Sequence, residues 1–225
     1  MQHKTLSDEE LTALRSSSRS PKPDARQLST NESDRCEIEL PHATLTELHF
    51  ALADAWTGSL TKLLDREVVV RLRDQSLSTY AQFVLGQPIP TVCAVVRAES
   101  LGFEAYFAAQ PTILYPMIDS LLGCKQSDPI PSRPITEIES GLAEVLFSQI
   151  LGDYQESWQS ALSLNLSIAR IEHNVQRLGA MNGGQKTYRS RYEILFGSEF
   201  GHLEICLPWD RTTQLRQRLS ASKSH

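Results

Sequence analysis

Apolar residues recur at α-helical spacing along two long stretches of the chain. The first stretch opens with Thr44 and Glu47, and the second opens with Thr136 and Glu139. In each pair a hydroxyl and a carboxylate stand three positions apart, which is the spacing of a helix capping box. We therefore predict a helix over residues 44–63 and a longer one from Thr136 to about Leu162. The apolar stripe of the first contains Leu45, Leu48, Leu52, Ala55, Trp56, Leu60 and Leu63, and that of the second contains Ile138, Leu142, Val145, Leu146, Ile150, Tyr154 and Trp158.

Shorter helical patterns end at glycines. Residues 77–86 close with Gly86, and a helix that begins at Pro111 closes with Gly123. Glycine is favoured at such an end because the residue after the helix commonly adopts a left-handed conformation. The proline-rich stretch after Gly123 predicts an exposed loop, and a last short helix is expected over residues 212–219.

Alternating apolar and polar residues predict six strands. The first, residues 67–73, places three apolar side chains on one face and Arg71 and Arg73 on the other. A plausible hairpin turn, Glu99–Gly102, joins the second and third strands, and Asn182-Gly183-Gly184 marks a turn before the fifth. The other five strands are predicted at residues 91–98, 103–109, 164–173, 187–196 and 202–207.

The order of these elements divides the globular part of the chain into two similar halves. Each half is led by a long helix and continues into strands that are mostly joined as hairpins. Such an order predicts an α/β domain with a pseudo-two-fold arrangement, in which a mainly antiparallel sheet packs against long helices.

The N-terminal segment differs from the rest of the chain. Residues 1–15 contain a capping-box pair, two leucines at helical spacing and a third close to the same stripe, which predict a short amphipathic helix that is marginal in isolation. Residues 16–40 are rich in serine, proline and charge, so we expect a disordered linker. The predicted globular domain covers residues 41–219, and a polar tail covers 220–225. The residues that define the short helix are Leu6, Ser7, Glu10, Leu11 and Leu14.

Composition narrows the class of protein. The net charge is −5, whereas a dedicated nucleic-acid-binding domain usually carries a basic stripe. No apolar run approaches the roughly 18 residues that a membrane span needs, and the first fifteen residues lack a secretory pattern. The four cysteines, Cys36, Cys93, Cys124 and Cys206, form no C-x-x-C pair and show no zinc-binding spacing with the six histidines. We expect a cytoplasmic protein without a cofactor or metal.

Candidate reactive groups have simpler structural explanations. His49 lies beside the apolar stripe of the first long helix, with no Ser, Cys or second His at a useful spacing, which favours a partly buried structural residue over a catalytic one. Arg71 and Arg73 share a strand face, where a solvated surface is favoured over a docking patch. Tyr154 and Trp158 are predicted to be core residues, and Cys124 is predicted to be an incidental exposed thiol rather than a redox sensor.

Several motifs in sequence order resemble the FliM family of flagellar motor switch proteins. The resemblance covers roughly residues 4–15 and 43–215, and it is carried by the order of the motifs more than by any one of them. Its segments are Leu6–Leu14, Thr91–Val96, Phe103–Phe107, Ile118-Asp119, Leu121-Leu122-Gly123, Ile135–Glu139, Arg170–Asn174 and Leu203–Trp209, with Trp158 near the end of the second long helix.

This resemblance implies a non-enzymatic subunit of the C-ring at the cytoplasmic base of the flagellum, peripheral to the inner membrane. Such a subunit couples phosphorylated CheY to the direction of rotation, and its middle domain contacts neighbouring FliM copies and the rotor protein FliG. The N-terminal peptide would bind phosphorylated CheY through Leu6, Ser7, Glu10, Leu11 and Leu14. The loop after Gly123 would bind FliG through Gly123, Cys124, Lys125 and Gln126.

Two departures from the family pattern leave other functions open. The family's Gly-Gly-x-Gly loop reads Gly123-Cys124-Lys125-Gln126 here, and the sequence stops at His225 without a FliN-type C-terminal domain, so assembly with FliN is not predicted. One alternative is a CheC-like phosphatase of phosphorylated CheY, which needs a helical Glu-x-x-Asn pair. Another is a shortened FliM paralogue that binds the regulator while free of the ring. The residues three positions after Glu47, Glu139 and Glu144 are Phe50, Leu142 and Phe147 rather than asparagine.

Overall fold

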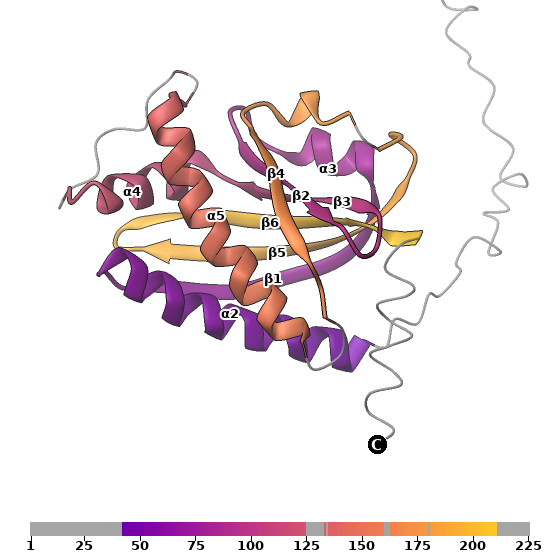
Figure 1. Cartoon of the computed structure of the whole chain (residues 1–225), viewed down its shortest axis with the longest axis horizontal. Coiled ribbons are helices and arrows are strands. Elements are labelled where there is room, and N and C mark those ends of the chain that lie inside the picture. The colour runs from indigo at the N-terminus through magenta and orange to yellow at the C-terminus, as the bar shows by residue number, and fades with distance from the viewer. Residues whose placement is uncertain (1–41, 125–132, 134, 160–162, 180, 211–225) are drawn as a thin grey trace, which may run out of the picture. The chain divides into compact units, whose positions relative to one another are not determined.

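The computed structural model describes residues 42–124, 133, 135–159, 163–179 and 181–210 (Figure 1). The predicted segments 1–15, 16–40 and 220–225, and the predicted helix over residues 212–219, lie outside this range. The elements are α2 (His42–Leu64), β1 (Val68–Thr79), α3 (Tyr80–Gly86), β2 (Val92–Ala98), β3 (Phe103–Ala109), α4 (Pro111–Leu121), α5 (Glu137–Trp158), β4 (Leu166–Glu172), the 3₁₀ turn η2 (Val175–Arg177), β5 (Lys186–Phe196) and β6 (Glu199–Pro208).

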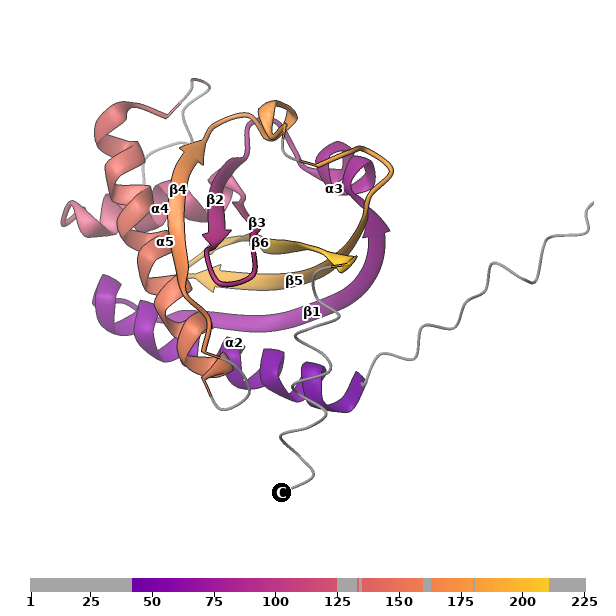
Figure 2. The same ribbon diagram turned by 45° about the vertical axis from the view of Figure 1, so that its right-hand side comes forward.

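The six strands form one antiparallel sheet in the order β1-β5-β6-β3-β2-β4. If β1 is exchanged with β4, β2 with β5 and β3 with β6, the result is the same strand order read from the opposite edge of the sheet. The centre of the sheet, where β3 pairs with β6, is therefore a pseudo-two-fold axis, and α2 corresponds to α5. Figure 2 shows the sheet curling, with α2 and α5 along its outer side. The predicted fold class is confirmed.

The main core lies between the sheet and helices α2, α4 and α5. Trp56 is fully buried, donates its indole N–H to the Ile150 carbonyl at 2.9 Å, and meets the Tyr192 ring edge-on at 4.6 Å. Helix α4 approaches β6 so closely that a Cβ on Gly201 would lie 2.5 Å from Thr112 Oγ1. A larger residue there would force the side chains of Thr112 and Ile113 to shift.

The other face of the sheet is covered in part by a smaller core. Tyr80 and Phe83 of α3 pack there with Val175 and Leu178 around η2, against the buried Tyr106 of β3. A buried ionic group lies next to this core, on strands β5 and β6. Its centre is Glu204, whose carboxylate accepts from Arg189 Nε at 2.6 Å and from Arg191 Nε at 3.2 Å. Two arginine partners compensate the cost of burying that charge.

Side chains of the two long helices hydrogen-bond to the starts of the two edge strands. Thr61 Oγ1 and Thr57 Oγ1 of α2 accept from the amides of Val68 and Val70 in β1, each at 3.0 Å. In the other half, Gln155 of α5 accepts from the Leu166 amide of β4 at 2.8 Å. These contacts satisfy amides that an open edge would offer to another strand.

Two details differ from the sequence prediction. Strand β1 continues to Thr79, because it pairs with β5 over its whole length, with a bulge between Leu72 and Asp74. On α5, Ile138 is 75% exposed and Val145 is 47% exposed, although both were predicted to be buried. The buried stripe is rotated away from them, because α5 faces both the sheet and α2. Its members are Ala143, Leu146, Phe147, Ile150, Leu151, Tyr154 and Trp158.

Candidate partner-binding surface

Helix α4 ends in a hydrogen-bonded glycine cap. Gly123 has φ +83°, and its amide donates to the Ser120 carbonyl at 2.9 Å. The amide of Cys124 donates to the Asp119 carbonyl at 2.9 Å, which completes a Schellman motif. Ser120 Oγ also donates to the Leu64 carbonyl at 3.1 Å, so the end of α4 is tied to the end of α2. The predicted left-handed cap at Gly123 is confirmed.

The start of α5 is held by a second local network. Thr136 and Glu139 form the predicted capping box, in which the Thr136 amide donates to Glu139 at 2.7 Å. Arg133 donates to both carboxylate oxygens of Glu139, each at 2.8 Å. This bidentate pair, aided by the cap, lowers the pKa of Glu139 to about 2. The two helix ends that flank the loop are therefore fixed by their own hydrogen bonds.

Exposed residues gather at these helix ends. Gly123 and Cys124 are exposed, Leu122 is 58% exposed and Ile138 is 75% exposed. The sequence prediction named the first two as FliG-binding residues and did not name Leu122, Ile138 or the Arg133–Glu139 pair. Their signal was an apolar residue on each side of a polar loop. The other predicted binding residues, Lys125 and Gln126 together with Leu6, Ser7, Glu10, Leu11 and Leu14, lie outside the described residues.

A cavity of about 430 Å³ adjoins Arg133. Its rim includes Ile89, which is 73% exposed, and the turn after β4. In that turn Glu172 accepts from the backbone amides of His173 and Asn174 at 3.0 and 3.2 Å. This is the Arg170–Asn174 motif of the sequence, and its acidic side chain both lines the cavity and holds the backbone of the turn.

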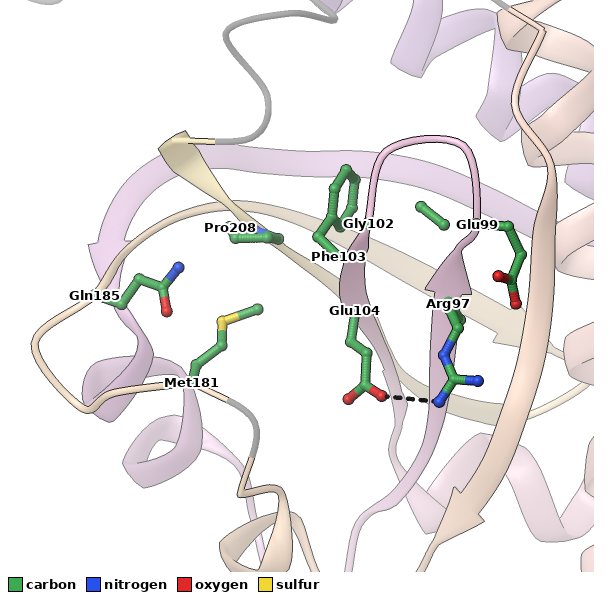
Figure 3. Close-up of a pocket in the computed structure, with 9 residues that line it drawn as sticks. Arg97, Glu99, Gly102, Phe103, Glu104, Met181, Gln185 and Pro208 are labelled. Carbon is green, nitrogen blue, oxygen red and sulfur yellow. Dashed lines mark ion pairs between the residues drawn. The ribbon is translucent and has the colours of Figure 1, made fainter.

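A second cavity, of about 450 Å³, lies beside the β2–β3 hairpin (Figure 3). An ion pair between Arg97 and Glu104, at 3.5 Å, forms part of its wall, and Met181 approaches from the opposite side. Among the described residues its lining includes no serine, threonine, cysteine or histidine, so it offers no hydroxyl or thiol nucleophile with a histidine base. The lining residues are Arg97, Ala98, Glu99, Gly102, Phe103, Glu104, Met181, Gln185 and Pro208.

His49 has a structural role. It is fully buried, its Nδ1 is hydrogen-bonded to the Tyr192 hydroxyl, and its Nε2 lies 3.5 Å from Ser190 Oγ. Burial lowers the pKa of His49 to about 3, so the ring is neutral at physiological pH. Within the described parts of the chain, no three His, Cys, Asp or Glu residues are grouped to hold a metal ion.

A family model described as "Flagellar motor switch protein FliM" matches residues 41–223. The FliM protein of Borreliella burgdorferi is 29% identical over 184 residues, covering 81% of this chain and 52% of that protein. The FliM protein of Treponema pallidum is 27% identical, covering 79% of this chain and 52% of that protein. The chain thus spans about half the length of these curated relatives.

Solved structures show the same fold. A FliM–SpeE complex from H. pylori contains a chain that superposes with a TM-score of 0.74 at 20% identity, covering 80% of this chain and 95% of that one. The H. pylori FliM middle domain superposes with a TM-score of 0.72 at 21% identity, covering 78% of this chain and 96% of that one. A chain of a FliG–FliM complex from H. pylori superposes with a TM-score of 0.71 at 23% identity, covering 74% of this chain and 91% of that one. Among the described residues, no helix is long and apolar enough to cross a membrane.

Proposed function

Because this chain belongs to the FliM family, we propose that it is a subunit of the flagellar motor switch that acts through protein–protein contacts. In this role it couples binding of phosphorylated CheY to the direction of flagellar rotation, and it lies on the cytoplasmic side of the inner membrane in the basal body. The family match over residues 41–223 is the observation that carries the proposal.

The FliG-binding surface is proposed at the end of α4 and the start of α5, on either side of the connecting loop. Leu122 and Ile138 expose apolar area there, and Gly123 and Cys124 begin the connecting loop. The hydrogen-bonded caps hold these ends in place before binding, so less conformational entropy is lost when a partner docks. The likeness to a chain of a FliG–FliM complex supports FliG as the partner, and Lys125 and Gln126 are proposed to complete the surface.

Phosphorylated CheY is proposed to bind the segment Leu6–Leu14. Three leucines and a capping box give this segment an apolar face and a defined start, and a partner groove would supply the packing that a helix this short needs. The linker of residues 16–40 would keep the captured regulator close to the domain and raise its effective concentration there.

An enzymatic role has less support. No glutamate of the sequence is followed three residues later by asparagine; after Glu47, Glu139 and Glu144 the third residue is Phe50, Leu142 and Phe147. Phe147 is 2% exposed and belongs to the core, so it cannot reach a substrate. The lifetime of phosphorylated CheY should therefore be the same with and without the full chain. A shortened lifetime would favour the CheC-like alternative.

Binding measurements on the full chain test the proposal. Leu11→Ala/Leu14→Ala should abolish capture of phosphorylated CheY and leave FliG binding unchanged, whereas Leu122→Ser/Ile138→Ser should do the reverse. Leu85→Ser is a matched control, because Leu85 is 81% exposed on α3. Binding of phosphorylated CheY without any binding of FliG would instead indicate a regulator-binding protein that acts outside the ring.

A further inference from the structure

Three apolar side chains lie side by side on the sheet face that α2, α4 and α5 leave uncovered. Val69 of β1 pairs with Leu195 of β5, which pairs with Phe200 of β6. Leu195 is 44% exposed and Phe200 is 47% exposed. The next register row, through Val70, points into the main core, so this row points to the opposite side.

Arginines border this apolar row. Arg71 and Arg73 follow it along β1 and are both exposed. Arg73 lies 4.0 Å from Glu193, whereas Arg71 forms no ion pair within the described residues. An apolar centre with a charged rim is the usual anatomy of a protein interface. Val69, Leu195, Phe200, Arg71 and Arg73 are called the sheet patch below.

A complementary surface lies on the outer side of α5, which crosses in front of the sheet in Figure 1. A hollow of about 460 Å³ lies between α5 and the end of α2, and the exposed Val145 and Glu144 line it. Glu144 has no ion-pair partner in the described part of the chain. We call this surface the helix groove, lined by Leu63, Gly141, Glu144, Val145, Ser148 and Gln149.

The charges of the two surfaces are opposite. Helix α5 carries five acidic residues and no lysine, arginine or histidine, and Glu144 is the one that lines the groove. The sheet patch instead offers Arg71 and Arg73. A two-fold contact of either surface with its own copy would place like charges together, which is unfavourable. Because the two surfaces lie on opposite sides of the domain, they cannot meet within one chain.

We propose that the sheet patch of one copy of this chain docks into the helix groove of the next copy. Phe200 and Leu195 enter the hollow beside Val145, and Arg71 pairs with Glu144. This contact is heterologous, so it repeats head to tail and can close into a ring. The choice of a second copy as the occupant rests on the proposed function as a ring subunit. The contact uses neither the α4–α5 loop nor the N-terminal segment.

Cysteine cross-linking tests the pairing of the two surfaces. Phe200→Cys and Val145→Cys are made separately in full chains in which Cys36 and Cys124 are replaced by serine. Under mild oxidation a mixture of the two should yield a disulfide-linked dimer containing one of each, and neither variant alone should yield a dimer. Dimers from one variant alone, or none from the mixture, would overturn the proposal.

Charge reversal gives an independent measurement by sedimentation of the full chain. Arg71→Glu and Glu144→Arg should each weaken self-association about tenfold, as expected when about 1.4 kcal/mol of interaction free energy is lost, and the double variant should restore it. Arg97→Glu, on the β2–β3 hairpin, is the matched control and should change nothing. Failure of the double variant to recover would overturn the pairing. Unchanged FliG binding in all four separates this result from a failure of the proposed function.

Discussion

Helices α2 and α5 occupy equivalent positions in the two halves of the fold, but they differ in what they leave exposed. Each contributes a fully buried tryptophan, Trp56 or Trp158, and a side chain that satisfies the start of an edge strand. Helix α2 carries the buried His49 and exposes Phe50, whereas α5 carries five acidic residues with no basic one and exposes Ile138 and Val145. The pseudo-repeat therefore duplicates the scaffold, while the outward faces of the two helices differ in charge.

Removing the indole of α2 should have the largest effect. Trp56→Ala deletes a fully buried ring together with its hydrogen bond to α5, and should lower the free energy of unfolding by about 3–5 kcal/mol. Urea denaturation of the full chain measures this change. Val145→Ala is the comparison on α5 and should cost no more than about 0.5 kcal/mol, as at most surface positions. Equal losses would show that Val145 packs as a core residue.

Trp56 and Val145 also show how far the structure could be predicted from the sequence. Helical spacing, the Thr136–Glu139 capping box and Gly123 predicted the helices and their ends, because local hydrogen bonds determine such features. Spacing alone could not show which apolar side of α5 faces the sheet, so Val145 and Ile138 were misassigned.

Features that depend on distant pairing were less accessible to sequence reasoning. The length of β1 follows from its register with β5, more than a hundred residues away, and so does the bulge between Leu72 and Asp74. The candidate FliG-binding surface was predicted in part. The glycine and the prolines predicted the loop, whereas the Arg133–Glu139 pair could be recognised only in the structure.

Lowering the pH should reveal the effect of the buried His49, which α2 has and α5 lacks. The folded-state pKa of His49, about 3, lies below the unfolded value of about 6.5, so the unfolded chain binds the extra proton first. The resulting stability is present above pH 6.5 and is lost as the pH falls toward 3. From this group alone we expect a loss of about 3 kcal/mol between pH 7 and pH 4.

The His49→Phe variant isolates that contribution in urea titrations at several pH values. It should be less stable than the parent at pH 7, because the Tyr192 hydroxyl loses its partner, but its stability should fall less between pH 7 and pH 4. Parallel pH profiles for the two proteins would mean that His49 does not titrate with unfolding.

A smaller effect is expected where α2 caps the edge strand. Thr57→Val leaves the Val70 amide without its acceptor and should cost about 1–3 kcal/mol. Thr57 also donates to the Ala53 carbonyl at 2.9 Å, and that bond is lost as well. Gln155→Leu is the counterpart on α5, where the Leu166 amide loses its acceptor.

Amide hydrogen exchange gives the local readout of both edge variants. Protection should drop at Val70 in the first and at Leu166 in the second. A loss of stability without the local drop at either amide would contradict the capping role.

The smallest predicted effects test whether the two helices are equivalent scaffolds. Gly58 of α2 and Gly152 of α5 lie at matching places inside their helices, and a Cβ at either would meet no atom within 4 Å. Replacing either with alanine should therefore stabilise the protein by about 0.5–1 kcal/mol, because the unfolded chain loses conformational freedom.

Gly123→Ala should have the opposite effect and lower the free energy of unfolding by about 1–2 kcal/mol. The reason is that a residue with a side chain is strained at φ +83°. Melting temperatures of the three variants would show two increases and one decrease. If Gly152→Ala lowered the melting temperature while Gly58→Ala raised it, the helices would not be equivalent even as scaffolds. The exposed face of α5 could then not be treated as a surface feature added to a duplicated framework.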